Sequence, residues 1–331
     1  MVCVSDKMIR IAQIGTKHAH AKGKYDTMLK FPDLFEVVGV VEPDEKRRTE
    51  MESNGYEGAT WLTETQLFST EGLRAVVVET EVSELVPTAQ RCIESGFHVH
   101  IDKPAGTSMS ALQQLHETAD QAGLTIQMGY MFRYNPGFEF LFDAITNGWL
   151  GSITEVNGMI GKSANDLLRL TIARFPGGGM FELGCHIIDP LVTILGPPEG
   201  VEAFTFRSHP EKDNLADNQL AVFRYPTAVA TIRSNHIDPH KRRKFEVIGE
   251  KGAVIIDPLE PPSIKLSLDK KFSRFSEGYQ RVDLTLQDGR YDGEFIDFAK
   301  VIRNEKKLRW DSTHDLAVHK AILQASEMEV D

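Results

Sequence analysis

Five short apolar runs, separated by stretches with helical patterning, constrain the fold of the first 130 residues. The runs occupy residues 9–14, 35–41, 74–78, 98–101 and 125–128, and helical patterns fill intervals such as residues 83–95 and 110–122. Continuous apolar strands that alternate with helices are typical of parallel sheets with both faces covered. The sequence therefore predicts an α/β class with an N-terminal, doubly wound Rossmann sheet.

The pattern changes after residue 130. Asn135 and Pro136 supply an N-cap and a first helical position. Strand-like segments joined by Gly, Pro and Asp turns then cover residues 201–207, 219–225, 229–235, 245–249, 253–257 and 264–268. We predict a dinucleotide-binding domain over residues 1–131. Residues 132–331 are predicted to form an α+β domain for substrate binding and oligomerisation. It would contain a large, predominantly antiparallel open sheet, and its last helices can pack back on the first domain.

Composition and charge argue against several classes of protein. The net charge of −11 argues against nucleic acid as a partner, because nucleic acid binding needs a basic surface. The apolar runs are too short to span a bilayer, so no membrane partner is expected. Cys3, Cys92 and Cys185 have no paired spacing, which indicates neither a disulfide framework nor a zinc site. The N-terminus lacks a signal-peptide pattern, and we expect a cytoplasmic protein.

The first strand ends in a partial dinucleotide-binding fingerprint. Gly15 keeps the first glycine of the G-x-G-x-x-G pattern, while Lys17 and His20 replace the second and third. A Rossmann domain holds a pyrophosphate at this turn, although an ordinary strand-to-helix turn would look the same. Glu42 ends the second strand, where an acidic residue hydrogen-bonds the adenosine ribose and repels a 2′-phosphate. These features favour NAD as the cofactor, with NADP as the alternative.

The same turn contains two histidines, His18 and His20. Such a pair suggests a metal site, but no third and fourth ligand stands at a suitable spacing. We therefore predict no metal and expect one of the imidazoles to donate a hydrogen bond to the pyrophosphate instead.

A glycine-led run in the second half carries candidate chemistry. Gly177, Gly178 and Gly179 precede Glu182 and His186. Glycines let the backbone come close to a ligand. On a helix, the four-residue spacing places the carboxylate and the imidazole on one face. A histidine with a nearby carboxylate is the usual arrangement for proton transfer near neutral pH.

Three segments resemble motifs of one known family. They are residues 98–105 around Asp102-Lys103-Pro104, residues 129–136, and residues 177–189 followed by Leu195-Gly196. Each is similar to a motif of the glucose-fructose oxidoreductase / inositol dehydrogenase family (Gfo/Idh/MocA), and their order matches the family over nearly the whole chain. The resemblance implies an NAD(P)-dependent oxidoreductase that transfers a hydride between a nicotinamide cofactor and a secondary alcohol of a sugar, cyclitol or related polyol. It also implies a homodimer or homotetramer assembled through the open face of the C-terminal sheet.

The resemblance also implies roles for individual residues. Lys103 would contact both cofactor and substrate, and His186, with Glu182 four residues earlier, would handle the proton of the substrate hydroxyl. The chemistry agrees, because alcohol oxidation needs a base and a group that stabilises negative charge on oxygen. The chain departs from the family pattern at three points. Glu182 replaces an Asp, Asp102 replaces a Glu, and only Thr80 remains of a Thr-Pro-Asn-x-x-His segment.

The candidate site residues fall into three groups. The predicted catalytic residues are Lys103, His186 and Glu182. The predicted cofactor-binding residues are Gly15, Thr16, His18, His20, Glu42, Thr80, Asp102 and Lys103. The predicted substrate-binding residues are Arg133, Asn165, Arg174 and Asp189. The last group is chosen because a polyol needs hydrogen-bonding partners. A surface ion pair is the alternative for Arg174, and a structural role is the alternative for Asp189.

Two other functions are compatible with the sequence. Some relatives oxidise and re-reduce their substrate to cleave a glycosidic bond, so that NAD is not consumed. The loss of the second and third glycines from the turn is also compatible with a non-catalytic protein that binds a nucleotide or a sugar. The intact Lys103 and His186 speak against that third interpretation.

Overall fold

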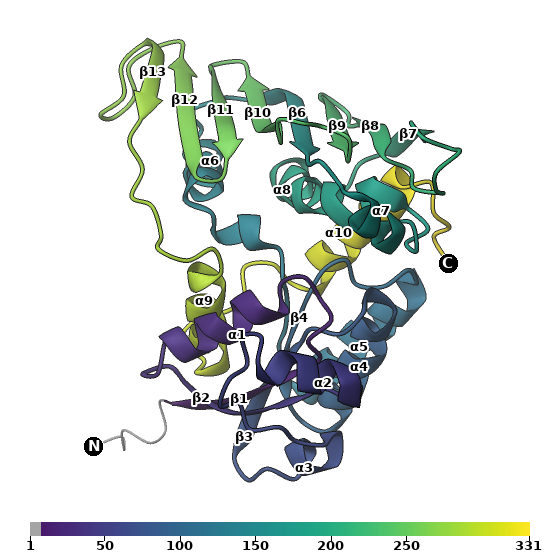
Figure 1. Ribbon diagram of the computed structural model, residues 1–331. Coiled ribbons are helices and arrows are strands. Elements are labelled where there is room, and N and C mark those ends of the chain that lie inside the picture. Colours follow the sequence, from purple (N-terminus) through teal and green to yellow (C-terminus); the bar gives the residue numbers. More distant parts are fainter. Residues whose placement is uncertain (1–7) are drawn as a thin grey trace, which may run out of the picture. The chain divides into compact units, whose positions relative to one another are not determined.

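The computed structural model describes residues 8–331 and divides into two compact units (Figure 1). Unit 1 contains the described residues up to Tyr130 together with Gly289–Leu316, and unit 2 contains Met131–Asp288 and Ala317–Asp331. Residues 1–7, which include Cys3 and the N-terminus used for the signal-peptide prediction, lie outside the described residues. No helix within residues 8–331 combines the length and the apolar character needed to cross a bilayer.

Unit 1 is built on a five-stranded parallel sheet. Its strands are β1 (Ile9–Ile14), β2 (Phe35–Val41), β3 (Leu73–Val78), β4 (His98–Ile101) and β5 (Ile126–Met128), which pair in the order β2-β1-β3-β4-β5. The apolar runs become strands because both faces of the sheet are covered, and Val76 and Val77, on opposite faces of β3, are both fully buried. The predicted doubly wound Rossmann class is confirmed.

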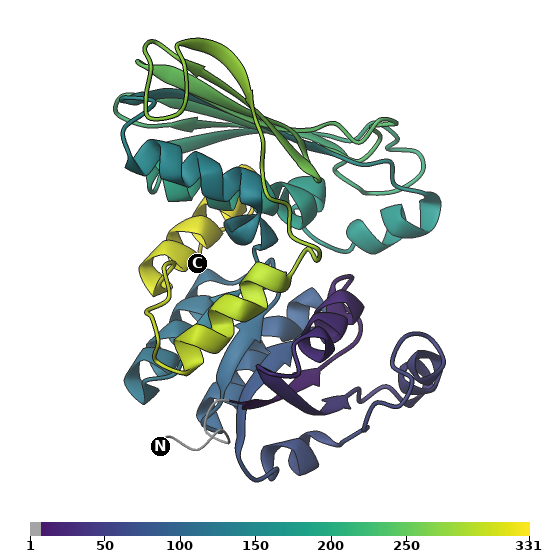
Figure 2. The same cartoon turned by 90° about the vertical axis from the view of Figure 1, so that its left-hand side faces the viewer.

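Helices cover both faces of this sheet. The chain runs from β1 to β2 on one side and from β3 to β4 on the other, and right-handed crossovers in opposite directions place their helices on opposite faces. Helix α1 (Ala21–Lys30) lies beside α9 (Asp292–Ile302), and α4 (Val82–Glu94) lies beside α5 (Met109–Ala122), as Figure 2 shows. The shorter helices α2 (Glu45–Glu52) and α3 (Glu64–Phe68) connect β2 to β3.

Unit 2 is built on an eight-stranded sheet. Its strands are β6 (Ile153–Gly161), β7 (Gly200–Phe206), β8 (Asn218–Arg224), β9 (Val229–Asn235), β10 (Arg243–Gly249), β11 (Gly252–Leu259), β12 (Pro262–Leu268) and β13 (Gly278–Val282). They pair in the order β13-β12-β11-β10-β6-β9-β8-β7, and every neighbouring pair is antiparallel except β6 and β9. The predicted large, predominantly antiparallel open sheet is confirmed.

One face of the eight-stranded sheet carries helices. Helix α6 (Pro136–Thr146) packs on β11 and β12, and α8 (Cys185–Leu195) packs on β6 and β9. The predicted start of α6 is confirmed, because the Asn135 side chain accepts a hydrogen bond from the Gly137 N–H at 2.9 Å. The remaining helical segments are the 3₁₀ helix Met131–Tyr134, α7 (Asp166–Ile172), the π-helix Met180–Gly184 and α10 (Ser312–Ala325).

Candidate active site

The carboxyl ends of β1 and β3 form the switch point of the parallel sheet, because the chain leaves β1 toward β2 and returns on its other side as β3. Open α/β sheets bind their ligands at such a point. Gly15 follows β1 with a φ of +92°. A Cβ at Gly15 would lie 2.7 Å from the backbone of Glu79 and Thr80, which follow β3. Gly15 is therefore required for the turn to close against the end of β3.

Glu42, predicted to bind the ribose, holds this turn in place. Its carboxylate accepts hydrogen bonds from the Thr16 N–H at 3.0 Å and from the Thr16 hydroxyl at 2.8 Å, and Glu42 is 4% exposed. The Arg47 guanidinium, which sequence reasoning missed, donates to the Thr16 carbonyl at 2.9 Å and to its hydroxyl at 3.2 Å. The ends of β1 and β2 are thus joined through Thr16.

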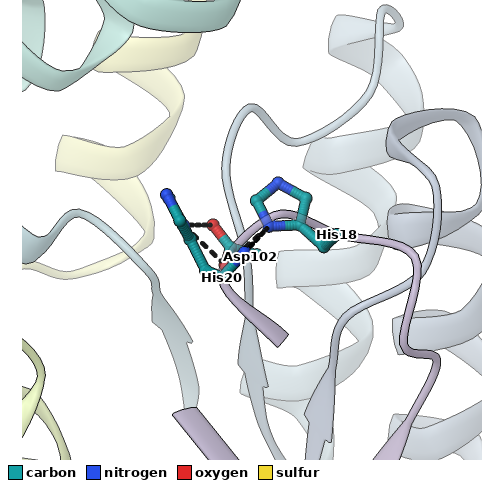
Figure 3. Close-up of side chains that lie close together, drawn as sticks. All are labelled: His18, His20 and Asp102. Atoms are coloured by element: carbon teal, nitrogen blue, oxygen red, sulfur yellow. Dashed lines mark hydrogen bonds and ion pairs between the residues drawn. The ribbon is translucent and has the colours of Figure 1, made fainter. Parts of the chain in front are cut away.

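His18 and His20 both point at Asp102, the residue that follows β4 (Figure 3). The Nδ1 atom of each ring lies 3.0 Å from Asp102 Oδ2. Ligand atoms of these three residues lie within 4.8 Å of one another. Asp102 is the third potential ligand that the sequence did not reveal, because it lies 82 residues beyond His20. A Lys24 ammonium also contacts Asp102 Oδ2 at 2.7 Å, so the carboxylate already carries a cationic partner. The absence of a metal remains a prediction.

Lys24 belongs to a cluster of fully buried charges beneath the turn. Its ammonium lies 3.1 Å from Glu79, 4.0 Å from Glu294 and 2.8 Å from His100 Nε2, in addition to its contact with Asp102. The sequence offered one signal for this cluster, since Lys24 shares the helical spacing of the buried Ala21 and Met28. No sequence argument supplied its partners, which come from β3, β4 and α9.

Space for the cluster is made by a glycine after β5. A Cβ at Gly129 would lie 2.5 Å from the Lys24 ammonium and 3.2 Å from the Asp102 Cα. Gly129 therefore allows Lys24 to reach Asp102, which is a packing role within the protein.

The two histidines differ in their electrostatics. Burial alone would lower the pKa of His18, but the Asp102 and Glu79 carboxylates outweigh it and raise the pKa to about 9. Burial lowers the pKa of His20 to about 4, although Asp102 opposes the shift. Burial would raise the pKa of Asp102, but His18, His20 and Lys24 hold it well below its usual range. At neutral pH the turn therefore contains one imidazolium, one neutral imidazole and one carboxylate.

Lys103, the predicted catalytic lysine of this unit, follows Asp102 directly and is 3% exposed. Its N–H donates to Asp102 Oδ1 at 2.6 Å, and its carbonyl lies 3.1 Å from His18 Nε2. The backbone of Lys103 is thus held on both sides by residues of the cluster. The structure brings together most of the predicted cofactor residues of unit 1 around this point.

In unit 2 the glycine-led run forms a π-helix, Met180–Gly184, followed directly by α8. Close approach of the backbone, expected toward a ligand, is instead toward the protein itself. A Cβ at Gly178, whose φ is +56°, would lie 2.6 Å from Ala216, and one at Gly179 would lie 2.3 Å from His236 Nδ1. π-Helical turns are frequent at functional sites.

Glu182 lies in the π-helix and has two partners that sequence reasoning missed. Its carboxylate accepts from the Lys162 ammonium at 3.0 Å on both oxygens, and His236 Nε2 lies 3.1 Å from Oε2. Lys162 follows β6 and His236 follows β9, the one parallel strand pair of this sheet. The Glu182 and Lys162 side chains are 20% and 17% exposed, so a ligand can reach this cluster.

The other predicted residues of unit 2 lie in varied surroundings. His186 is in the first turn of α8, 2% exposed, with its ring 5.7 Å from the ring of Phe132. Arg133 and Asp189 form a buried pair in which the guanidinium donates twice to Oδ1, at 2.7 and 3.0 Å. Each of these two buried charges thus has a partner of opposite charge. Asn165 caps α7 by accepting from the Leu168 N–H, and Arg174 is exposed.

The parallel sheet with its charged switch point, together with the large antiparallel sheet, defines a two-domain protein of the dinucleotide-binding class. Residues 9–130 match the family described as "Oxidoreductase family, NAD-binding Rossmann fold", and residues 138–255 match the "GFO/IDH/MocA C-terminal domain". The chain belongs to the GFO/IDH/MocA oxidoreductase family, as its motifs predict.

Individual relatives are distant. The chain is 30% identical over 187 residues to "Uncharacterized oxidoreductase YhhX" of Escherichia coli (strain K12), covering 55% of this chain and 52% of that protein. It is 25% identical over 175 residues to the "Trans-1,2-dihydrobenzene-1,2-diol dehydrogenase" of Bos taurus, covering 52% and 51%. The chain thus spans about half the length of these curated relatives. The solved aldose-aldose oxidoreductase from Caulobacter crescentus, complexed with glycerol, shares the fold, with a TM-score of 0.80, 18% identity, and coverage of 97% and 98%.

Proposed function

We propose that this protein is an NAD(P)-dependent oxidoreductase that transfers a hydride between a nicotinamide cofactor and a secondary alcohol of a sugar, cyclitol or related polyol. The observation that carries the proposal is the placement of Lys103 at the carboxyl edge of the Rossmann sheet, with its backbone held by Asp102 and His18. The names of the relatives support the substrate class, because a dihydrodiol dehydrogenase and an aldose-aldose oxidoreductase both act on hydroxyl-bearing rings or sugars.

The residues at the switch point fit a dinucleotide. The turn at Gly15 leads into α1, whose first helical turn carries no acidic residue. The N–H groups and the dipole at the N-terminus of a helix favour an anionic pyrophosphate. The bound nicotinamide would supply the hydride acceptor or donor. Because the Glu42 carboxylate lies at the end of β2 and would repel a 2′-phosphate, we propose NAD as the preferred form.

The protein's own residues would then manage the oxygen and its proton. In the oxidative direction, His186 accepts the hydroxyl proton as the carbon gives up its hydride. The Lys103 ammonium stabilises the negative charge that develops on the oxygen. Glu182, with Lys162 and His236, offers a mixed set of donors and acceptors that suits the remaining hydroxyls of a polyol. Arg133 and Asp189 would support the site through their buried pair.

The proposal is tested by calorimetric titration with NAD and NADP, followed by a screen of polyols, sugars and glycosides for NADH formation. We expect NAD to bind, at least one polyol or sugar to be oxidised, and Lys103→Met to lose turnover while still binding NAD. Absence of binding to either nucleotide would refute the proposal. Cleavage of a glycoside with sub-stoichiometric NAD and no net NADH would assign the redox-assisted cleavage instead.

A further inference from the structure

We propose that His18 is a positioning residue, whose imidazolium bridges the Asp102 carboxylate and the Lys103 carbonyl and so fixes the lysine that acts in catalysis. This inference rests on the proposed function of Lys103 and extends it to a residue of the dinucleotide turn. Both ends of the bridge are within hydrogen-bonding distance, at 3.0 Å from Nδ1 to Asp102 Oδ2 and 3.1 Å from Nε2 to the Lys103 oxygen.

The chemistry of the two partners sets the protonation state of the ring. A carboxylate and a backbone carbonyl can only accept hydrogen bonds, whereas a neutral imidazole has a single N–H to donate. Only the doubly protonated ring can serve both partners at once. The pKa of about 9, raised by Asp102 and Glu79 against the effect of burial, agrees with that requirement.

A neutral His18 ring has a different hydrogen-bond partner for its Nδ1 atom. The His20 N–H lies 3.3 Å from His18 Nδ1 and can donate to it once that nitrogen has lost its proton. In that state His18 can still donate from Nε2 to Lys103, but its Nδ1 lone pair would face the Asp102 carboxylate. Deprotonation therefore breaks the bridge on the Asp102 side and loosens the segment that carries Lys103.

The charged groups around His18 come from several elements. Asp102 and Lys103 follow β4, Glu79 follows β3 with its carboxylate 3.5 Å from Nδ1, and Lys24 on α1 contacts both carboxylates. His20, whose ring centroid is 4.8 Å away, shares the Asp102 carboxylate. His20 faces Asp102 through Nδ1, so a single donor satisfies that contact and the neutral ring suffices. The Nε2 atom of His18 lies 3.1 Å from the Lys103 carbonyl oxygen, which links this histidine to the backbone of the lysine.

The experiment compares wild type with His18→Gln, which lacks the second ring donor and the charge. We expect kcat to fall about 10- to 100-fold, as for other losses of positioning, with little change in the Kd for NAD. We also expect the kcat of the wild type to fall as the pH rises through about 9, where His18 loses its proton, and this fall to be absent from the variant. His98→Gln is the matched control, because His98 lies at the other end of β4 and contacts the Thr125 N–H; its kcat and pH profile should equal those of wild type.

The outcomes separate the inference from the proposed function. A His18→Gln variant with wild-type kcat and pH profile, or one altered only in NAD affinity, would overturn the positioning role while Lys103→Met remained inactive. Retention of turnover by Lys103→Met would overturn the proposed function itself. If His18→Gln does not fold, NMR titration of the wild-type histidines decides. A His18 resonance that titrates near pH 9 supports the bridge, and one near the ordinary value of 6.5 contradicts it.

Discussion

At the scale of single residues, Lys24 is the least expected feature of this dinucleotide-binding unit. It is a fully buried lysine on the first helix, in contact with Asp102 and Glu79. Removing one member of a buried ion cluster is strongly destabilising, because the remaining charges lose their partner and cannot reach water. The loss of the Lys24 ammonium should therefore lower the stability of the fold more than the loss of an exposed ion pair would.

We predict that Lys24→Met lowers the free energy of unfolding by about 3–5 kcal/mol. Lys22→Met is the matched control, because Lys22 is on the same helix and pairs with Asp26 at the exposed surface. It should change stability by less than about 1 kcal/mol. Urea denaturation at neutral pH measures both variants, and equal effects of the two substitutions would contradict the role given to Lys24.

The charge of His18 should make the stability of the protein depend on pH. Its pKa rises from 6.5 to about 9 on folding, so the stability gained from its protonation is complete below pH 6.5 and is lost as the pH rises toward 9. The expected loss for this buried group is about 3 kcal/mol. Urea denaturation at several pH values should show this decline in wild type and a flatter profile in His18→Gln. Parallel profiles would mean that His18 is not charged in the folded state.

Among the helices and strands, the sequence predicted those whose positions are set by local residue patterns. The apolar runs specify β1 to β5, and Asn135 with Pro136 specifies the start of α6. The strand β13 was not predicted, because Gly278–Val282 is an edge strand whose residues are mostly polar and which pairs with β12 alone. The π-helix could not be predicted either. Its glycines fit against Ala216 and His236, which are distant in the sequence.

The candidate site divides in the same way. Motifs identified Gly15, Glu42 and Lys103, which follow the ends of strands where the fold gathers them. The partners of Glu182 and of Lys24 were missed, because Lys162, His236, Glu79 and Glu294 belong to no local motif and meet them only through tertiary packing. Local sequence patterns thus identify residues at the ends of strands, but they do not identify the buried charged residues that pack against them.

Closure of the dinucleotide turn depends on Gly15, which permits a test. Gly15→Ala combines a positive φ with a Cβ placed 2.7 Å from the backbone of Glu79 and Thr80, whereas Gly58→Ala has a positive φ of +76° and nothing within 4 Å. Gly58→Ala should cost about 1–2 kcal/mol from the backbone alone. Gly15→Ala should cost more than this in urea denaturation and should abolish NAD binding in calorimetry. If both variants were equally stable and the Gly15 variant still bound NAD, the turn would not need the close approach of Gly15 to the backbone of Glu79 and Thr80.

At the scale of the whole molecule, the eight-stranded sheet leaves aromatic side chains on its surface. Phe204 and Phe206 on β7 are 46% and 60% exposed, and they line a shallow pocket of about 260 Å³ with Leu220 on β8. Exposed apolar groups of this kind on a sheet face favour a protein partner. On the basis of the family resemblance, we propose a second copy of this chain as that partner.

We therefore predict that Phe206→Glu, alone or with Phe204→Glu, converts an oligomer into a monomer without unfolding it. Light scattering coupled to size-exclusion chromatography gives the mass, and circular dichroism checks the fold. Leu167→Glu on α7 is the control, because Leu167 is 76% exposed and lies outside this face. A wild-type protein that is already monomeric, or an oligomer unaffected by both phenylalanine substitutions, would contradict an interface on this face.

The proposed function requires two groups, Lys103 at the carboxyl edge of the Rossmann sheet and His186 on α8, for the NAD-dependent oxidation of a hydroxyl. The most direct measurement is NADH formation by wild type, Lys103→Met and His186→Gln with one polyol or sugar substrate, alongside the Kd for NAD of each protein. We expect each substitution to lower kcat by at least about 100-fold while NAD still binds, because each removes a group needed in the transition state. Wild-type kcat in either variant would contradict the claim.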